Sequence, residues 1–435
     1  MTYPDTSNLR ALTAKLQRLT QLKHERGAAD VSKILEQAET KLQQSLNDLA
    51  DCPDAPELNQ QEPDELESIQ HLRPQGPRTL TADWPRDKLE ELIRGAFLGR
   101  CAGCILGSPV EFYSIDRMTR LARENKQQFP PAQYWLSVPD MYGLKADCMS
   151  RHRYTQTHMD GVPVDDDLVY TVLGLLAIEQ YGADFTTNQL GELWKNRLTH
   201  ACTAERTALD RLLEGIPGRN AADPEDPMTE WIGGWIRADP WAYAAPGWPE
   251  KAASMAWSDA MLTHRRNGVY GTMFFAAAIS AAFAVDDPFE ALEAGLAEIP
   301  EQCRFANEIR WALDTAEDIN NYREARARAD ERFDGMHHTH AINNASLVVF
   351  GLALGKTDFD AVIGNTVAMG MDNDCTAATA GSLFGATYGR NAIPDKWIHP
   401  FDDRIYTYIS GHEELSLEDV VCRFTTQALK VTETD

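Results

Sequence analysis

Basic residues are scarce in this sequence. It has 41 lysines and arginines against 66 aspartates and glutamates, which gives a formal net charge of −25 at pH 7. A surface of that sign repels nucleic-acid phosphates and anionic lipid headgroups. We therefore expect no nucleic-acid-binding surface and no membrane docking. A phosphorylated substrate would need a bound cation to meet it.

Long apolar runs and clustered cysteines are also missing. No uncharged apolar run reaches about 18 residues, and no basic segment followed by an apolar one opens the chain. The eight cysteines are scattered, which is typical of reduced thiols, so we expect a cytoplasmic protein. Cys101 and Cys104 form a CxxC pair without a second pair at zinc spacing. We expect both thiols to be packed in a close contact between helices.

Alternating runs of valine, isoleucine and threonine, the pattern of exposed strands, are nearly absent. Apolar residues instead recur at helical spacing or fill whole segments, as in 168–182, 271–284, 343–355 and 358–370. The segment 271–284 is almost entirely apolar, which predicts a central helix. The sequence therefore predicts an all-α core.

The first 88 residues differ from the rest. Leucines at alternating threes and fours, interrupted near Gly27, predict an N-terminal helical hairpin over 1–50. Residues 51–88 hold six prolines and many acids, a composition typical of a linker. We expect 89–435 to form the main helical domain. The hairpin is an appendage through which the chain could form a homo-oligomer.

Two acidic clusters stand directly before apolar helices. Asp165, Asp166 and Asp167 precede one predicted helix, and Asp372 and Asp374 precede a helix of small residues. One acid is enough to cap a helix and to meet its dipole. Adjacent carboxylates without cations raise each other's pKa values and repel. Five acids at the ends of two helices therefore indicate cation binding.

The ligand chemistry indicates which cation. Carboxylate and hydroxyl oxygens favour hard ions such as Mg²⁺ or Mn²⁺. Consecutive residues have Cα atoms about 3.8 Å apart, so neighbouring acids can serve two ions about 3.5–4 Å apart. The glycines and alanines at 377–386 would let the second helix approach its neighbours closely. We expect the two clusters to converge on a pair of Mg²⁺ or Mn²⁺ ions.

Three stretches resemble, in order, motifs of the ADP-ribosylglycohydrolase family. They are GAFLGRCAGCILGSPVE (95–111), DDDLVYTVLGLL (165–176) and GMDNDCTAATAGSLFGA (370–386). The resemblance covers roughly 89–435. It implies an orthogonal helical bundle that holds two metal ions and hydrolyses an N- or O-glycosidic bond to ribose, in a small-molecule or protein-linked substrate.

Carried over by position, the resemblance implies roles for particular residues. Glu111 matches a glutamate that gates the site or assists the water, and Asp166 and Asp374 act with it in catalysis. Cys375 replaces a threonine or serine ligand, and it could leave that role to Thr376. The implied metal ligands are Asp165, Asp166, Asp167, Asp372, Asp374 and Cys375.

Substrate contacts are expected in two places. RRNGVYG (265–271) lies where the family has a substrate-cradling loop, and Asn267, Gly268 and Tyr270 are its candidates. The stretch HHTHAINNAS (337–346) offers Asn343 and Asn344, which either touch the substrate at the site rim or cap a helix. The aromatic stretch 236–253 could stack on a nucleobase through Trp241, Tyr243 and Trp248, or simply cover the core.

Breaking a glycosidic bond passes through an oxocarbenium-like transition state, which nearby carboxylates and a metal-held water favour. The sequence therefore predicts a Mg²⁺- or Mn²⁺-dependent glycosidase. Two alternatives stay open: a metal-dependent phosphoesterase on nucleotides or ADP-ribose, and a non-catalytic relative like the lens crystallin of this family.

Overall fold

The computed structural model describes residues 3–80, 84–145 and 148–433. The chain divides into two units. The smaller unit holds the residues up to Gln60 together with Asp334–Met336. The larger unit holds Gln61–Phe333 and His337–Asp435, and it contains every acid predicted to bind metal.

The described residues form 20 α-helices and two small sheets, which confirms the all-α prediction. The helices are α1 (Ser7–Glu25), α2 (Val31–Ala50), α3 (Leu58–Gln61), α4 (Leu66–Leu72), α5 (Arg86–Gly107), α6 (Ile115–Glu124), α7 (Asp166–Tyr181), α8 (Thr187–Arg197), α9 (Thr203–Leu213), α10 (Asp239–Ala244), α11 (Pro249–Ala260), α12 (Asn267–Ala282), α13 (Pro288–Leu296), α14 (Arg304–Ala316), α15 (Tyr322–Arg332), α16 (Ala341–Gly355), α17 (Phe359–Ala368), α18 (Asn373–Tyr388), α19 (Asp395–Ile398) and α20 (Leu417–Glu433). The strands are β1 (Leu144–Lys145), β2 (Met149–Ser150), β3 (Arg404–Tyr406) and β4 (Glu414–Ser416).

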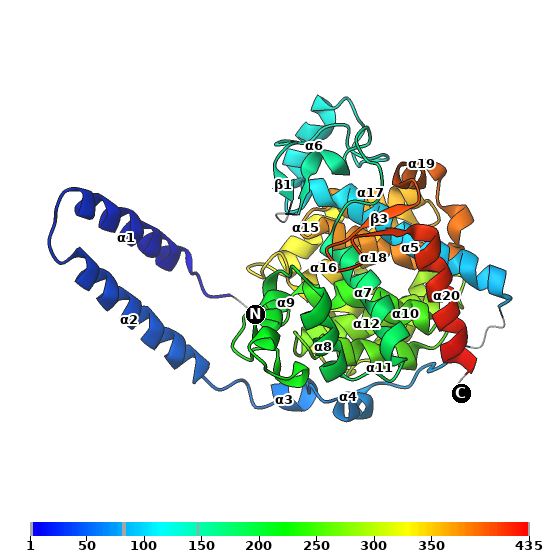
Figure 1. Cartoon of the computed structure of the whole chain (residues 1–435), viewed down its shortest axis with the longest axis horizontal. Helices are drawn as coiled ribbons and strands as arrows, with labels where there is room; N and C mark the ends of the chain where they lie inside the picture. The colour runs from blue at the N-terminus through cyan, green and yellow to red at the C-terminus, as the bar shows by residue number, and fades with distance from the viewer. Residues whose placement is uncertain (1–2, 81–83, 146–147, 434–435) are drawn as a thin grey trace. The chain divides into compact units, whose positions relative to one another are not determined.

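The smaller unit contains the predicted hairpin. Helices α1 and α2 are joined by a turn in which Gly27 has a φ of 69°, a conformation that glycine adopts without strain (Figure 1). Neither helix contains a buried residue, and Leu12 and Leu49 are 66% and 69% exposed. The leucine pattern therefore forms the helices without enclosing a core. Self-association through the hairpin stays a prediction.

Part of the stretch with linker composition belongs to the larger unit and is packed into it. Ile69 of α4 is fully buried. Arg73 and Arg78 bind the buried Glu298 at 2.6 and 2.9 Å. These contacts hold α4 and the residues after it in place even though the composition is rich in proline.

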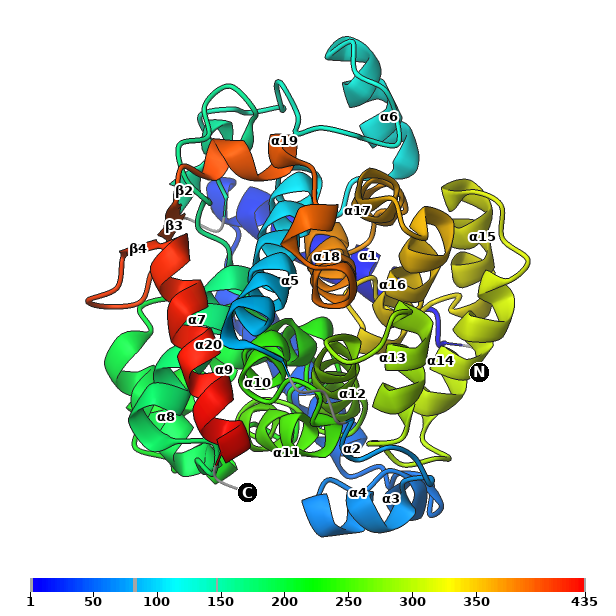
Figure 2. The ribbon, with the colours of Figure 1, turned by 90° about the vertical axis from the view of Figure 1, so that its right-hand side faces the viewer.

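The core of the larger unit is built around helices without a polar face. Every residue of α12 is buried, as the apolar segment 271–284 predicted. Nearly all of α18 is buried as well, and α5 lies beside it (Figure 2). An enclosed helix needs apolar residues on all sides, and these two helices supply them.

Small residues bring α5 and α18 into backbone contact. A Cβ on Gly99 would lie 2.2 Å from the carbonyl oxygen of Gly381, and one on Gly103 would lie 2.0 Å from that of Ala377. Any larger side chain at these positions would push the helices apart. Cys101 and Cys104 of α5 are buried free thiols, as predicted for a close helix contact.

The two small sheets lie in connections between helices. Strands β1 and β2 form an antiparallel pair in which Lys145 faces Met149, and β3 pairs with β4 in the same way. The first pair matters for function because it positions Lys145. Among the described residues, no helix combines the length and the apolarity needed to cross a bilayer.

Candidate active site

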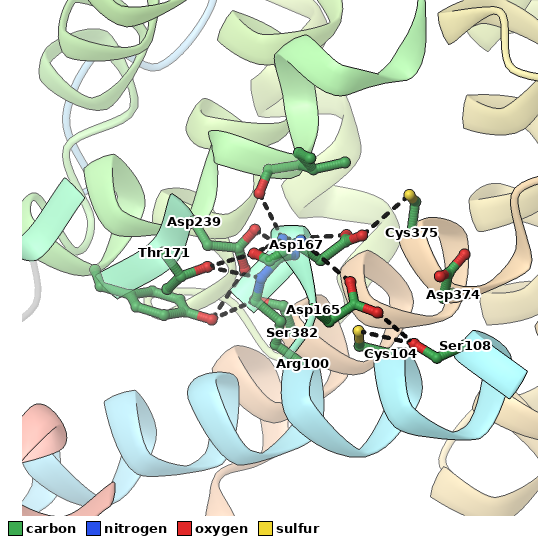
Figure 3. Close-up of polar contacts among 12 residues, drawn as sticks. Arg100, Cys104, Ser108, Asp165, Asp167, Thr171, Asp239, Asp374, Cys375 and Ser382 are labelled. Atoms are coloured by element: carbon green, nitrogen blue, oxygen red, sulfur yellow. Dashed lines mark hydrogen bonds and ion pairs between the residues drawn. The ribbon is translucent and has the colours of Figure 1, made fainter. Parts of the chain in front are cut away.

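The two acidic clusters meet at the starts of α7 and α18. Asp165 caps α7, and its side chain accepts a hydrogen bond from the backbone N–H of Asp167 at 3.2 Å. Asp372 is the residue before α18, but its side chain accepts no capping hydrogen bond. The thiol of Cys375 donates to Asp167 Oδ2 at 3.1 Å, which joins the two helix starts directly (Figure 3).

Lys145 forms a second bridge between the clusters. Its Nζ lies 2.8 Å from Asp165 Oδ2 and 2.7 Å from Asp374 Oδ2. Glu111 Oε2 is the third carboxylate, 3.4 Å away. Burial opposes the charged form of Lys145, but these three carboxylates hold its pKa well above the usual value. The ammonium is therefore charged throughout the physiological range.

Residues of helix α5 and directly after it bind the aspartates at the start of α7. The Ser108 hydroxyl, directly after the helix, donates to Asp165 Oδ2 at 2.5 Å, and Cys104 lies 3.7 Å from Ser108 (Figure 3). Arg100 is fully buried and binds Asp239 at 2.7 Å and Asp167 Oδ1 at 3.4 Å. Because Arg100 also donates to the Asp167 carbonyl oxygen at 2.8 Å, it fixes the first turn of α7.

Several buried oxygens of the site have no hydrogen-bond partner among the described residues. They are Asp372 Oδ1, Asp374 Oδ1 and Thr376 Oγ1. Buried polar atoms are normally paired, so these oxygens indicate a missing ligand. A hard cation suits two carboxylate oxygens and a hydroxyl. The donor set therefore fits Mg²⁺ or Mn²⁺, and two groups of site residues have ligand atoms close enough to share an ion: Cys104, Asp165 and Asp167; and Asp372, Asp374 and Cys375.

The crowding of carboxylates changes their pKa values. Burial and the Asp165 charge raise the pKa of Asp166 to about 7. Burial and the Asp374 charge raise the pKa of Glu111 to about 8 and that of Asp372 well above its usual range. Asp165 is the exception: burial acts upward, but the Lys145 ammonium holds the pKa of Asp165 below its usual value. The site therefore holds more carboxyl groups than the Lys145 ammonium can neutralise, and without a further cation their proton affinity rises.

The acids open into a cavity of about 450 Å³. Glu111, Asp166, Asp167, Asp372 and Asp374 line one part of it. The lining elsewhere comes mainly from the α9 start, from the 231–236 segment and from the loop before α16, and includes Arg151, Glu205, Trp231, His337 and His338. The volume lies in the range of small-molecule sites.

Three aromatic rings stack in a row along this cavity, and a fourth meets the last of them edge-on. Trp231 and His337 are parallel with centroids 4.2 Å apart, and His337 stacks on His338 at 4.2 Å. Phe112 meets His338 edge-on at 4.8 Å. Burial lowers the pKa values of both histidines, so the stack is uncharged near neutral pH.

The expected substrate residues of α12 lie elsewhere. Asn267 is buried and binds Glu230, Glu62 and the Phe305 backbone, and the Tyr270 hydroxyl donates to the Pro63 carbonyl oxygen at 2.6 Å. A Cβ on Gly268 would meet the Thr229 carbonyl oxygen. None of the three belongs to the cavity lining described above. Their role in substrate binding stays a prediction.

Asn343 and Asn344 bind the backbone of the histidine loop that lines the cavity. The Asn343 side chain donates to the His337 carbonyl oxygen at 2.9 Å, and the Asn344 side chain donates to those of His338 and His340. Asn344 also accepts from the Asp372 N–H at 3.2 Å. They therefore connect the histidine loop to the acidic cluster, while His340 caps α16.

Sequence reasoning missed the residues that enter the site from loops. Trp241 and Tyr243 are buried in the core, which agrees with the alternative that this stretch covers the core, and the stack comes from Trp231 and two histidines instead. Lys145 carried no signal, because it lies in a connection without periodicity and only the tertiary structure brings it to Asp374. The exposed aromatic Phe112 beside Glu111 was the one local hint for the ring stack.

The chain resembles known proteins in its family and in its fold. A model of the ADP-ribosylglycohydrolase family matches residues 85–425. Among solved structures, one titled "ADP-ribosylglycohydrolase-related protein complex" superposes with a TM-score of 0.51 and 19% identity, covering 79% of this chain and 99% of that chain. At that identity the likeness shows the fold alone. No curated protein matches the chain.

The matched region covers most of the sequence and contains both acidic clusters. The chain therefore belongs to the ADP-ribosylglycohydrolase family. The predicted bundle of this family type is confirmed.

Proposed function

We propose that the chain is a Mg²⁺- or Mn²⁺-dependent hydrolase that cleaves the glycosidic bond of an ADP-ribosyl group. The observation that carries the proposal is the convergence of acids from α7 and α18 on one cavity, with Asp372 Oδ1 and Asp374 Oδ1 unpaired. Family membership supports a hydrolase of the ADP-ribosyl type.

The cation would be held by Asp372 and Asp374, with the Thr376 hydroxyl or the Cys375 sulfur as a further ligand. When bound, it would polarise a water and orient ribose hydroxyls beside the anomeric carbon. The remaining carboxylates face the same space and would stabilise the positive charge that develops on the sugar as the bond breaks. This is the chemistry for which a crowded acidic site is suited.

Glu111 is the residue best placed to accept the proton of the attacking water. It lines the cavity and lies near the Asp165–Lys145–Asp374 bridge. Burial and the Asp374 charge raise the pKa of Glu111, which makes it a stronger base than an exposed glutamate. Asp166 also lines the cavity and would join the cation-binding carboxylates.

The opposite lining suits a nucleotide. The uncharged Trp231–His337–His338 stack offers a flat apolar face to a base. Arg151 lines the same cavity, where its positive charge would favour a diphosphate. Together these residues support an ADP-ribosyl group over a simple riboside.

The test is an activity assay on a defined substrate panel. ADP-ribosyl-arginine, ADP-ribosyl-serine, ADP-ribose and a set of nucleosides are incubated with the protein in Mn²⁺, in Mg²⁺ and in EDTA. We expect release of ADP-ribose from one of the conjugates, abolished by EDTA and by Asp374→Ala. Asp116→Ala, which removes a carboxylate that is 86% exposed, is the matched control and should keep full activity.

Two outcomes would contradict the proposal. Phosphate or nucleotide release with the glycosidic bond intact would make the protein a phosphoesterase. Absence of turnover on every substrate, with no heat of Mn²⁺ or Mg²⁺ binding, would make it a non-catalytic member of the family.

A further inference from the structure

The position of Lys145 in the acidic cluster has a direct bearing on how many metal ions the site can hold. Six carboxylates gather here: Glu111, Asp165, Asp166, Asp167, Asp372 and Asp374. Two described cations contact them, Lys145 and Arg100. Arg100 is shared with Asp239 on the core side. Of these two cations, Lys145 is therefore the one that lines the cavity.

The ammonium occupies a site where a metal ion would bridge the two helices. It lies within 2.8 Å of one carboxylate from each cluster, and its side chain is only 13% exposed. Asp165 Oδ2 receives both Lys145 and the Ser108 hydroxyl, so that oxygen is already saturated. A divalent ion between Asp165 and Asp374 would have to displace the lysine from this pocket.

Other oxygens of the cluster have no such partner in the described part of the chain. Asp372 Oδ1, the second oxygen of Asp374 and the Thr376 hydroxyl are buried and unpaired among the residues that the structure describes. The Cys375 thiol has its sulfur within 4.8 Å of ligand atoms of Asp372 and Asp374, and it donates to Asp167. Some carboxylate oxygens of the cluster are therefore paired with the ammonium, and others have no partner among the described residues.

We propose that Lys145 is a resident cation that replaces one metal ion, so that the site binds a single divalent ion, held by Asp372 and Asp374. The inference rests on the metal dependence proposed above. It reduces the number of bound ions from the two that the sequence predicted to one. A tethered ammonium needs no recruitment from solution, and its charge repels a second ion in the same pocket.

Metal stoichiometry tests this inference without any measurement of turnover. Mn²⁺ binding is followed by titration calorimetry and by metal analysis after desalting, for the wild type, Lys145→Met and Lys251→Met. Methionine keeps the length of lysine without its charge. Lys251 is the matched control, because it is ion-paired with Asp184 outside the site.

We expect one Mn²⁺ per chain in the wild type and in Lys251→Met, and two in Lys145→Met. Lys145→Arg, which retains the charge, should again bind one. Should Lys145→Met fail to fold, Mn²⁺ anomalous scattering from wild-type crystals answers the same question. One peak beside Asp372, with the ammonium still between Asp165 and Asp374, supports the inference.

Two Mn²⁺ ions in the wild type, or one in Lys145→Met, would overturn the role of Lys145 and leave metal-dependent hydrolysis standing. No bound Mn²⁺ in either protein would overturn both, since the unpaired oxygens of Asp372 and Asp374 would then hold no cation.

Discussion

The Cys375 thiol and the Asp167 carboxylate, 208 positions apart in sequence, lie 3.1 Å from each other. The contact ties the first turn of α18 to the first turn of α7. Burial raises the pKa of the thiol well above its usual value, and the Asp167 and Asp372 charges act in the same direction. In the cation-free protein the thiol is therefore a hydrogen-bond donor. A bound metal would favour its thiolate.

This thiol predicts a metal preference. Sulfur favours soft ions and oxygen favours hard ones. We expect Cys375→Ser to lower Cd²⁺ affinity relative to Mg²⁺ affinity by about tenfold or more, while the serine hydroxyl keeps the hydrogen bond to Asp167. Titration calorimetry with both ions measures the ratio. Cys202→Ser is the control, because Cys202 lines the cavity outside the two ligand groups. An unchanged ratio in Cys375→Ser would show that the sulfur is not a ligand.

The contact between α5 and α18 predicts a large steric effect. A Cβ on Gly99 would lie 2.2 Å from a backbone oxygen that cannot rotate away. We expect Gly99→Ala to reduce the free energy of unfolding by about 3 kcal/mol, although alanine is the better helix former. Urea denaturation measures it.

Gly182→Ala measures the effect of backbone strain on stability without a steric clash. Gly182 has a φ of 76°, and no neighbouring atom lies within 4 Å of the place that an added Cβ would take. Its ψ of −175° places it in a region that is nearly restricted to glycine, so the cost of this substitution, about 1–3 kcal/mol, comes from the backbone alone. A Gly99→Ala protein as stable as the wild type would contradict the close packing of α5 on α18.

His340 predicts a dependence of stability on pH. Burial lowers its pKa to about 4, and Arg304 and His337 act in the same direction. A histidine whose folded pKa is depressed contributes stability above the unfolded pKa of about 6.5, and that contribution is lost as the pH falls toward 4. Between pH 7.5 and pH 5 the loss is about 2 kcal/mol.

His340→Asn isolates this effect. The asparagine side chain can accept the Ile342 N–H that His340 Nδ1 now accepts at 3.2 Å, so the cap of α16 is kept without a titrating group. We expect the variant to lose less stability than the wild type between the two pH values, as measured by urea unfolding. Equal losses in both proteins would mean that His340 titrates normally in the folded state.

The ring stack predicts selective loss of nucleotide affinity. Stacking of a base on an aromatic side chain contributes about 1–3 kcal/mol, so we expect Trp231→Ala to weaken ADP-ribose binding by about tenfold or more. Ribose 5-phosphate, which has no base, should bind the two proteins equally. Calorimetry with both ligands is the measurement. Equal weakening of both ligands would indicate a general disturbance of the cavity instead of a lost base contact.

Local patterns in the sequence determined the helices and much of the acidic site. Apolar periodicity and the scarcity of strand patterns depend on neighbours three or four residues away, so they predicted the all-α core and the buried α12. The acids before α7 and α18 were visible because helix starts attract carboxylates and because one cap needs only one of them.

Only the tertiary structure decided what completes that site. The β1–β2 pair places Lys145 between Asp165 and Asp374, and the loop before α16 places His337 against Trp231. Such contacts join segments that share no period and no spacing, and each depends on how the helices beneath them pack. The sequence by itself determined where negative charge collects, and the packing of α5, α7 and α18 decided which cation and which rings meet it.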